Sequence, residues 1–132
     1  MPERVVAQAE SLLGSLDGLR VVVLGAAYRG GVKETAFSGV FATVDALRAR
    51  GARVVVHDPL YSDDELAALG FDAYSYGESA DVAIVQADHA EYSTLTPAQV
   101  PGLRLIVDGR RITDPAVWAG VPRVVIGEGS QG

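Results

Sequence analysis

The chain has 132 residues, 48% of them hydrophobic, and a formal net charge of −6 at pH 7. This length and apolar content predict one domain with its own core, and the negative charge argues against nonspecific binding to nucleic acid. The absence of cysteine excludes disulfides and thiolate catalysis, and the wide sequence separation of His57 and His89 argues against a zinc site.

Targeting signals and membrane spans are not evident in the sequence. It has no run of about 18 apolar residues, as a membrane helix needs, and its N-terminus lacks the basic and apolar regions of a signal peptide. We therefore expect a cytoplasmic protein that does not contact membranes. Residues 1–132 are expected to form one domain, with a lead-in helix and turn over 1–18 and a flexible tail over 127–132.

The first half of the chain predicts a strand, a helix and a strand after the lead-in helix. Residues 2–14 have apolar positions at helical spacing. The β-branched run 21–24, bounded by Gly25, predicts a strand buried on both faces. A helix is expected over 38–50, capped by Thr35 or Ser38, and a second strand over 53–57.

The second half continues the alternation of strands and helical segments. A short helix is expected after Ser62 or Asp63, and a helical turn over 89–95. Further segments are a short edge strand over 71–74, strands over 82–86, 103–107 and 123–126, and a short helix over 114–118. This pattern predicts the α/β class: a doubly wound, Rossmann-like three-layer domain with a mainly parallel sheet of five or six strands.

Polar residues follow the predicted strands at the edge where such folds bind ligands. They are Arg29 and Lys33 after the first strand, Asp58 after the second, Asp88 and His89 after Gln86, and Arg110 and Arg111 after Val107. Arginine and lysine beside a helix N-terminus predict a site for a phosphorylated ligand, and the arginine fork suits a diphosphate. The alternative is a plain strand-to-helix turn with solvated cations.

The glycine-bearing stretch departs from the dinucleotide fingerprint. Ala27 stands where the second glycine of G-x-G-x-x-G lets the backbone approach a pyrophosphate. Asp58 ends the second strand as a ribose-binding acid would, but it lies 58 − 25 = 33 positions past Gly25, against about 20 in the fingerprint. Both departures argue against NAD binding in the usual way.

Four sequence blocks carry a family resemblance. They are VVVLGAAYRGGVKETAFS (21–38), VVVHDP (54–59), ADVAIVQADHAEY (80–92) and LIVDGRRI (105–112). In this order and spacing they resemble the C-terminal, UDP-binding domain of the UDP-glucose/GDP-mannose dehydrogenase family. The resemblance implies one part of a polysaccharide-biosynthesis oxidoreductase, whose other parts are an NAD-binding domain and a central domain.

The resemblance also implies a set of substrate-binding residues. Matching the family motif position by position gives Tyr28, Arg29, Thr35, Ser38 and Arg110 as contacts for a UDP-sugar or another nucleotide-diphosphate sugar. Lys33 is added to this set as a nearby cation that would compensate for a motif arginine missing from this chain. The family oxidises the C6 alcohol of the sugar with NAD through a cysteine. Because this chain has neither a cysteine nor the NAD fingerprint, it is expected to bind no cofactor itself and to be inactive in isolation.

Two departures from the family pattern leave alternatives open. The family usually has Arg after the threonine and Pro after the serine, where this chain has Ala36 and Gly39. One alternative is therefore a docking or regulatory module that kept the fold without ligand binding. A weaker alternative is a generic Rossmann-like NAD-binding domain.

Overall fold

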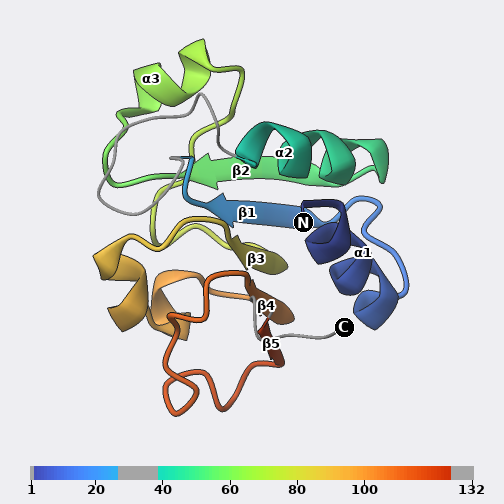
Figure 1. The fold of residues 1–132 in the computed structure, drawn as a ribbon, viewed down its shortest axis with the longest axis vertical. Coiled ribbons are helices and arrows are strands. Elements are labelled where there is room, and N and C mark those ends of the chain that lie inside the picture. Colours follow the sequence, from blue (N-terminus) through green and yellow to red (C-terminus); the bar gives the residue numbers. More distant parts are fainter. Residues whose placement is uncertain (1, 27–38, 126–132) are drawn as a thin grey trace.

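The computed structural model describes residues 2–26 and 39–125. Within these ranges it contains a sheet of five parallel strands flanked by helical segments (Figure 1). The strands are β1 (Arg20–Leu24), β2 (Arg53–His57), β3 (Val82–Val85), β4 (Leu105–Asp108) and β5 (Arg123–Val125). The predicted α/β class with a parallel sheet is confirmed.

The strand order β2-β1-β3-β4-β5 places the first strand beside the second and the third. The chain therefore proceeds to one side after β1 and to the other side after β3, so the topological switch point lies between these two strands. In the register of the sheet, Leu24 is level with both His57 and Val85, and Val85 is level with Asp108. Four strands thus end in one row, and the residues that follow them share one edge.

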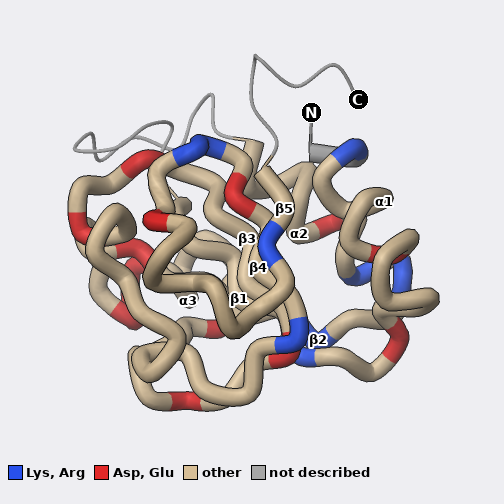
Figure 2. The backbone as a smooth tube through the Cα atoms, turned by 90° about the horizontal axis from the view of Figure 1, so that it is seen from below, with Lys and Arg blue, Asp and Glu red and all other residues tan. Residues whose placement is uncertain are grey.

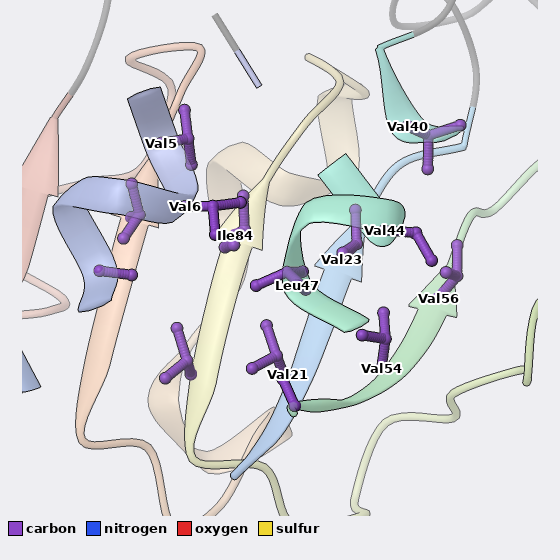
Figure 3. Packing of buried hydrophobic residues seen from close by; sticks show 14 of the residues in the cluster. Val5, Val6, Val21, Val23, Val40, Val44, Leu47, Val54, Val56 and Ile84 are labelled. Carbon is purple, nitrogen blue, oxygen red and sulfur yellow. The ribbon is translucent and has the colours of Figure 1, made fainter. Parts of the chain in front are cut away.

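One face of the sheet is covered by two helices, α1 (Pro2–Leu13) and α2 (Val40–Ala49). Figure 3 shows Val5 and Val6 of α1 and Val44 and Leu47 of α2 packed over the strand side chains, such as Val21. These side chains are at most 6% exposed, so the contact is a tightly excluded apolar layer. It holds α2 against β1 and β2, and α1 against β4 and α2.

The opposite face is covered by irregular chain and two 3₁₀ helices, η1 (Ala90–Thr94) and η2 (Pro97–Gln99). Here Tyr92, Leu95 and Trp118 pack against sheet residues that include Leu24 and Ile106. Among the described residues, the second covering layer therefore has 3₁₀ turns in place of α-helices. None of the helices within 2–26 and 39–125 is long and apolar enough to cross a bilayer.

The short helix α3 (Asp63–Ala68) follows β2 and starts with a complete capping box. The Ser62 hydroxyl accepts a hydrogen bond from the Glu65 N–H at 3.1 Å, and the Glu65 carboxylate accepts from the Ser62 N–H at 2.8 Å. Acidic residues in the first turn also match the helix dipole. Figure 2 shows mainly acidic segments around α3, in agreement with the cation-free stretch 54–103.

Two predicted elements are wrong. Residues 71–74 form only a single parallel bridge, between Ala73 and Val56, because their pairing with β2 is limited to the hydrogen bonds of Asp72 and Tyr74 with Val56. Residues 114–118 form turns, with the Asp114 carbonyl accepting from two N–H groups and no continuation into a helix. The helix expected over 38–50 begins only at Val40, with Gly39 as its N-cap.

Candidate functional site

The carboxyl edge of the sheet contains only part of the predicted site. Arg110 is described there, directly after β4 and its glycine. Five of the predicted contacts lie in the segment 27–38, outside the described residues: Tyr28, Arg29, Lys33, Thr35 and Ser38. Their convergence with Arg110 therefore stays a prediction.

The turn after β4 is organised around the carboxylate of Asp108, which is fully buried. Its Oδ1 accepts hydrogen bonds from the N–H groups of Arg110 at 2.9 Å and Arg111 at 2.7 Å. Its Oδ2 accepts from the N–H groups of Ile112 at 2.9 Å and Thr113 at 2.7 Å, and from the Thr113 hydroxyl at 2.5 Å. One carboxylate therefore fixes four consecutive peptide groups.

Protonation of Asp108 is suppressed by these contacts. Burial raises the pKa of this carboxyl group, but the hydrogen bonds from Thr113, Arg110 and Arg111 outweigh burial and place the pKa below its usual value of 3.8. Asp108 is consequently charged at neutral pH. Its role is to shape the turn, because its oxygens are occupied by protein donors.

Gly109 and Arg111 show how tightly this turn is folded. A Cβ atom at Gly109 would lie 2.9 Å from the carbonyl oxygen of Val85, the last residue of β3. Arg111 has a φ of 61°, in the left-handed region that residues with side chains rarely adopt. The Asp-Gly-Arg-Arg sequence therefore suits this turn: a carboxylate to organise it and a glycine where β3 approaches.

Arg110 and Arg111 are exposed on this edge. The Arg110 guanidinium lies 3.4 Å from the Asp88 carboxylate, and both side chains are about 40% exposed. A solvated pair of this kind contributes only about 0–1 kcal/mol. An anionic ligand can therefore compete for Arg110 at little cost.

Asp58 and His89 form a second buried centre on the same edge, with exposures of 4% and 3%. The Asp58 Oδ2 accepts from the Ala26 N–H at 2.8 Å and lies 2.8 Å from His89 Nε2. Its Oδ1 accepts from the Leu60 N–H at 2.8 Å. The carboxylate thus connects the ends of β1 and β2 to the residue that precedes η1.

Gly25 marks the point where the chain leaves β1. It has a φ of +111°, and a Cβ atom there would lie 2.5 Å from the Cβ of Ala87. Its N–H donates to the His57 carbonyl at 2.7 Å, which couples it to β2. Only glycine combines this backbone conformation with such close approach.

The described part of the edge is not strongly cationic. Arg110 is paired with Asp88 in the same region, and the carboxylates of Asp58 and Asp108 are buried. The predicted surplus of positive charge therefore depends on Arg29 and Lys33, which lie outside the described residues. Within the described residues, Asp58 and Asp108 hold the backbone of this edge in place, and Arg110 and Arg111 are its exposed cations.

His57 and Tyr92 form a separate polar cluster at the end of β2. The His57 Nδ1 lies 2.8 Å from the Tyr92 hydroxyl, and the His57 ring stacks on Tyr76 with centroids 4.4 Å apart. Burial lowers the pKa of His57 despite the nearby carboxylates of Glu91 and Asp58, which raise it. Burial also raises the pKa values of Tyr76 and Tyr92, so both hydroxyls stay protonated.

A cavity of about 310 Å³ adjoins this cluster. The residues around it are largely aromatic and acidic: His57, Asp58, Pro59, Tyr61, Asp63, Leu66, Tyr74, Ser75 and Tyr76. The Tyr74 hydroxyl donates to the Glu78 carbonyl and the Tyr76 hydroxyl to Glu91, so the protein itself uses both groups. Arg110 and Arg111 do not line the cavity.

Sequence reasoning missed the roles of three residues at this edge. The family resemblance includes Asp108 within the block 105–112 but gives no function for it in the turn, and the sequence suggests Asp58 only as a ribose-binding acid. His89 is predicted at the start of a helical turn, with no sign that it is buried against Asp58. The sequence feature that could have indicated these centres is an aspartate at the end of β4 (Asp108) and directly after β2 (Asp58). No group of three His, Asp or Glu side chains within 2–26 and 39–125 could hold a metal ion.

The sequence model of the UDP-glucose/GDP-mannose dehydrogenase family, UDP binding domain, matches residues 22–115. The chain belongs to this family. The matched range runs from β1 to just beyond the turn organised by Asp108, so it includes both buried carboxylate centres.

Individual members of the family agree with this assignment. UDP-glucose 6-dehydrogenase AglM from Haloferax volcanii is 34% identical over an alignment of 106 residues, which covers 74% of this chain and 24% of that protein. A UDP-glucose dehydrogenase structure from Pyrobaculum islandicum superposes with a TM-score of 0.74 at 26% identity, covering 96% of this chain and 29% of that chain.

A more distant structure shares the fold. The UDP-N-acetyl-mannosamine dehydrogenase Cap5O from S. aureus has a TM-score of 0.71 at 20% identity, with 96% of this chain and 30% of that chain covered. The chain thus spans about a quarter to a third of the length of these relatives.

Proposed function

We propose that this chain is the unit of a nucleotide-sugar dehydrogenase that binds the nucleotide diphosphate of a UDP-sugar. The observation that carries the proposal is the Asp108-organised turn, which presents Arg110 at the carboxyl edge of the sheet, inside the range matched by the UDP-binding family. Ligands of doubly wound folds bind at this edge.

The role of Arg110 follows from its surroundings. Asp108 fixes the backbone of Arg110, while the guanidinium stays exposed and only weakly paired with Asp88. A guanidinium can donate two parallel hydrogen bonds to phosphate oxygens. Arg110 would therefore hold a phosphate of the ligand, and Tyr28, Arg29, Lys33, Thr35 and Ser38 would complete the site.

The oxidation itself is assigned to other parts of the enzyme. We propose that an NAD-binding domain and a central domain of the same enzyme supply the cofactor and the reacting groups, because this sequence contains no cysteine and no dinucleotide fingerprint. The chain covers only 24% and 29% of the lengths of two relatives, which supports the assignment of the oxidation to other domains. The chain would thus anchor the substrate and leave the redox step to its partners.

The NAD-binding alternative has a specific structural argument against it. A ribose-binding acid must offer its oxygens to the sugar hydroxyls. The Asp58 side chain is fully buried, and both of its oxygens accept hydrogen bonds from within the protein. Asp58 would therefore be a poor ribose ligand. The docking-module alternative is distinguished by the absence of any nucleotide binding.

Calorimetric titration of the chain with UDP, UDP-glucose and GDP-mannose tests the proposal, with uridine as the ligand without phosphates. We expect UDP to bind and uridine not to bind at the same concentration. Arg110→Ala should weaken UDP binding about tenfold or more, as the loss of a charge-assisted bond predicts. The matched control is Arg104→Ala, since Arg104 is exposed just before β4 at the opposite edge. Equal affinities of the two variants for UDP would contradict the proposal.

A further inference from the structure

The connection between β1 and α2 carries most of the predicted ligand contacts, and Ala26 is its last described residue before the segment 27–38. We propose that His89 is a positioning residue for this connection, acting through Asp58 on the Ala26 peptide. The proposal rests on the proposed function, because it concerns how the same site is held in place. His89 itself would not touch the ligand.

The geometry forms a chain of two hydrogen bonds from His89 to the backbone of β1. A carboxylate can only accept, so the 2.8 Å contact between His89 Nε2 and Asp58 Oδ2 requires a proton on Nε2. The same Oδ2 accepts the Ala26 N–H at 2.8 Å. The position of the carboxylate oxygen therefore depends on the imidazole and sets the direction of the Ala26 N–H.

Burial makes this arrangement stiff. Ala26 is fully buried, and His89 and Asp58 are at most 4% exposed, so water does not compete for their hydrogen bonds. A buried carboxylate that loses one of its donors is destabilised, even where other donors remain. Displacement of either partner would therefore be transmitted to Ala26.

The backbone around Ala26 leaves little other freedom. Gly25 donates to the His57 carbonyl, and the Gln86 N–H donates to the Leu24 carbonyl at 2.8 Å. The ends of β1, β2 and β3 are thus joined immediately before Ala26. Asp58 then holds the next N–H, so the peptide of Ala26, the last described residue before 27–38, is fixed as well.

A residue that only stabilised the core would behave differently from a positioning residue. Leu95→Ala provides the matched control. Leu95 is 2% exposed and directly follows η1, the 3₁₀ helix that His89 precedes. It packs with Tyr92 in the apolar cluster on the sheet face that η1 covers. Its truncation should lower the melting temperature without moving Ala26. His89→Phe removes the donor, and His89→Gln retains an amide N–H close to the position of Nε2.

The test combines the amide resonance of Ala26 in a ¹H–¹⁵N spectrum, UDP affinity and melting temperature for these variants of the whole chain. We expect His89→Phe to shift the Ala26 resonance and weaken UDP binding at least tenfold. His89→Gln should restore both to near the wild-type values, and Leu95→Ala should change only the melting temperature. If His89→Phe lowers the melting temperature but leaves the Ala26 resonance and the UDP affinity unchanged, the proposal is overturned.

Two further outcomes remain decisive. If the wild-type chain does not bind UDP, the proposed function fails, and the Ala26 resonance in His89→Phe and His89→Gln decides the positioning role alone. If His89→Phe does not fold, Asp58→Asn takes its place. Removal of the negative charge beside the Ala26 N–H must then shift that resonance, and an unchanged resonance would overturn the proposal.

Discussion

Replacement of Asp108 by Asn tests the turn on which the candidate site depends. The carboxylate accepts five hydrogen bonds, and an Asn side chain has only one oxygen with which to replace them. If that oxygen takes the Oδ2 position, with its three donors, the N–H groups of Arg110 and Arg111 lose their acceptor. The NH₂ group of the Asn side chain, itself a donor, would then face the N–H groups of Arg110 and Arg111.

The expected loss of stability can be worked out from these contacts. A donor left without an acceptor costs about 1–3 kcal/mol, and the lower value applies here because Arg110 and Arg111 are exposed, giving about 2 kcal/mol for the pair. Replacement of the charged acceptor by a neutral one at Oδ2 adds about 1 kcal/mol. We therefore expect Asp108→Asn to lower the free energy of unfolding by about 3 kcal/mol. With a urea m-value of about 1.5 kcal/mol/M, the midpoint falls by about 2 M.

The pH dependence gives an independent check. The pKa of Asp108 is lower in the folded chain than its usual value of 3.8, so the unfolded state binds the proton more readily. The stabilisation is complete above this usual value and is lost as the pH falls through the folded pKa. The difference in the free energy of unfolding between wild type and Asp108→Asn should thus become smaller below about pH 4.

Urea denaturation at pH 7 and at acidic pH measures both effects. Asp114→Asn is the control, because Asp114 is exposed and its carboxylate accepts one local N–H bond, from Ala116 at 2.9 Å. Its effect should stay within about 0.5 kcal/mol. A free energy of unfolding for Asp108→Asn equal to that of wild type, with a gap that does not change with pH, would refute the reasoning.

Three further perturbations test other parts of the structure. Gly25→Ala should destabilise the fold by about 3 kcal/mol or more in chemical denaturation, from its φ of +111° and the overlap with Ala87, whereas Gly70→Ala, with a φ of +92° and open space, should cost only about 1–2 kcal/mol; similar losses would contradict the close approach of β3. Ser62→Ala removes the cap of α3 and should cost about 1 kcal/mol, measured in the same way, and an unchanged midpoint would show that the capping box does not matter. Because burial lowers the pKa of His57, stability should decline as the pH falls below the usual value of 6.5. Denaturation of His57→Gln across this range should show less of that decline, and a curve parallel to the wild type would exclude His57 as its source.

The sheet could be predicted because its sequence signals are local. Apolar β-branched runs such as 54–56 in β2 are buried on both faces of a parallel sheet, so each strand is recognised without knowing its neighbours. Residues 71–74 contain no β-branched residue, and only Ala73 pairs with β2, although Phe71 and Tyr74 pack on opposite faces of the sheet as the side chains of a strand would. Two aromatic residues without such a run were not enough to define a strand.

The buried polar centres could be located from the sequence but not explained by it. An aspartate at the end of a strand is visible in the sequence, yet its partners come from elsewhere in the chain. Asp58 is 31 positions from His89 and 32 from Ala26, and only the parallel register brings their segments together. Asp108 instead binds the residues that follow it, so its role was closer to being predictable from the sequence.

The most direct test of the proposed nucleotide site is a ¹H–¹⁵N titration of the chain with UDP that maps where the ligand binds. We predict that the amide resonances of Ala26, Gly109 and Arg110, at the carboxyl edge of the sheet, shift in a saturable way. Those of Gly18 and Arg104, which precede β1 and β4 at the opposite edge, should not move. The absence of shifts at millimolar UDP, or shifts confined to the opposite edge, would contradict the account.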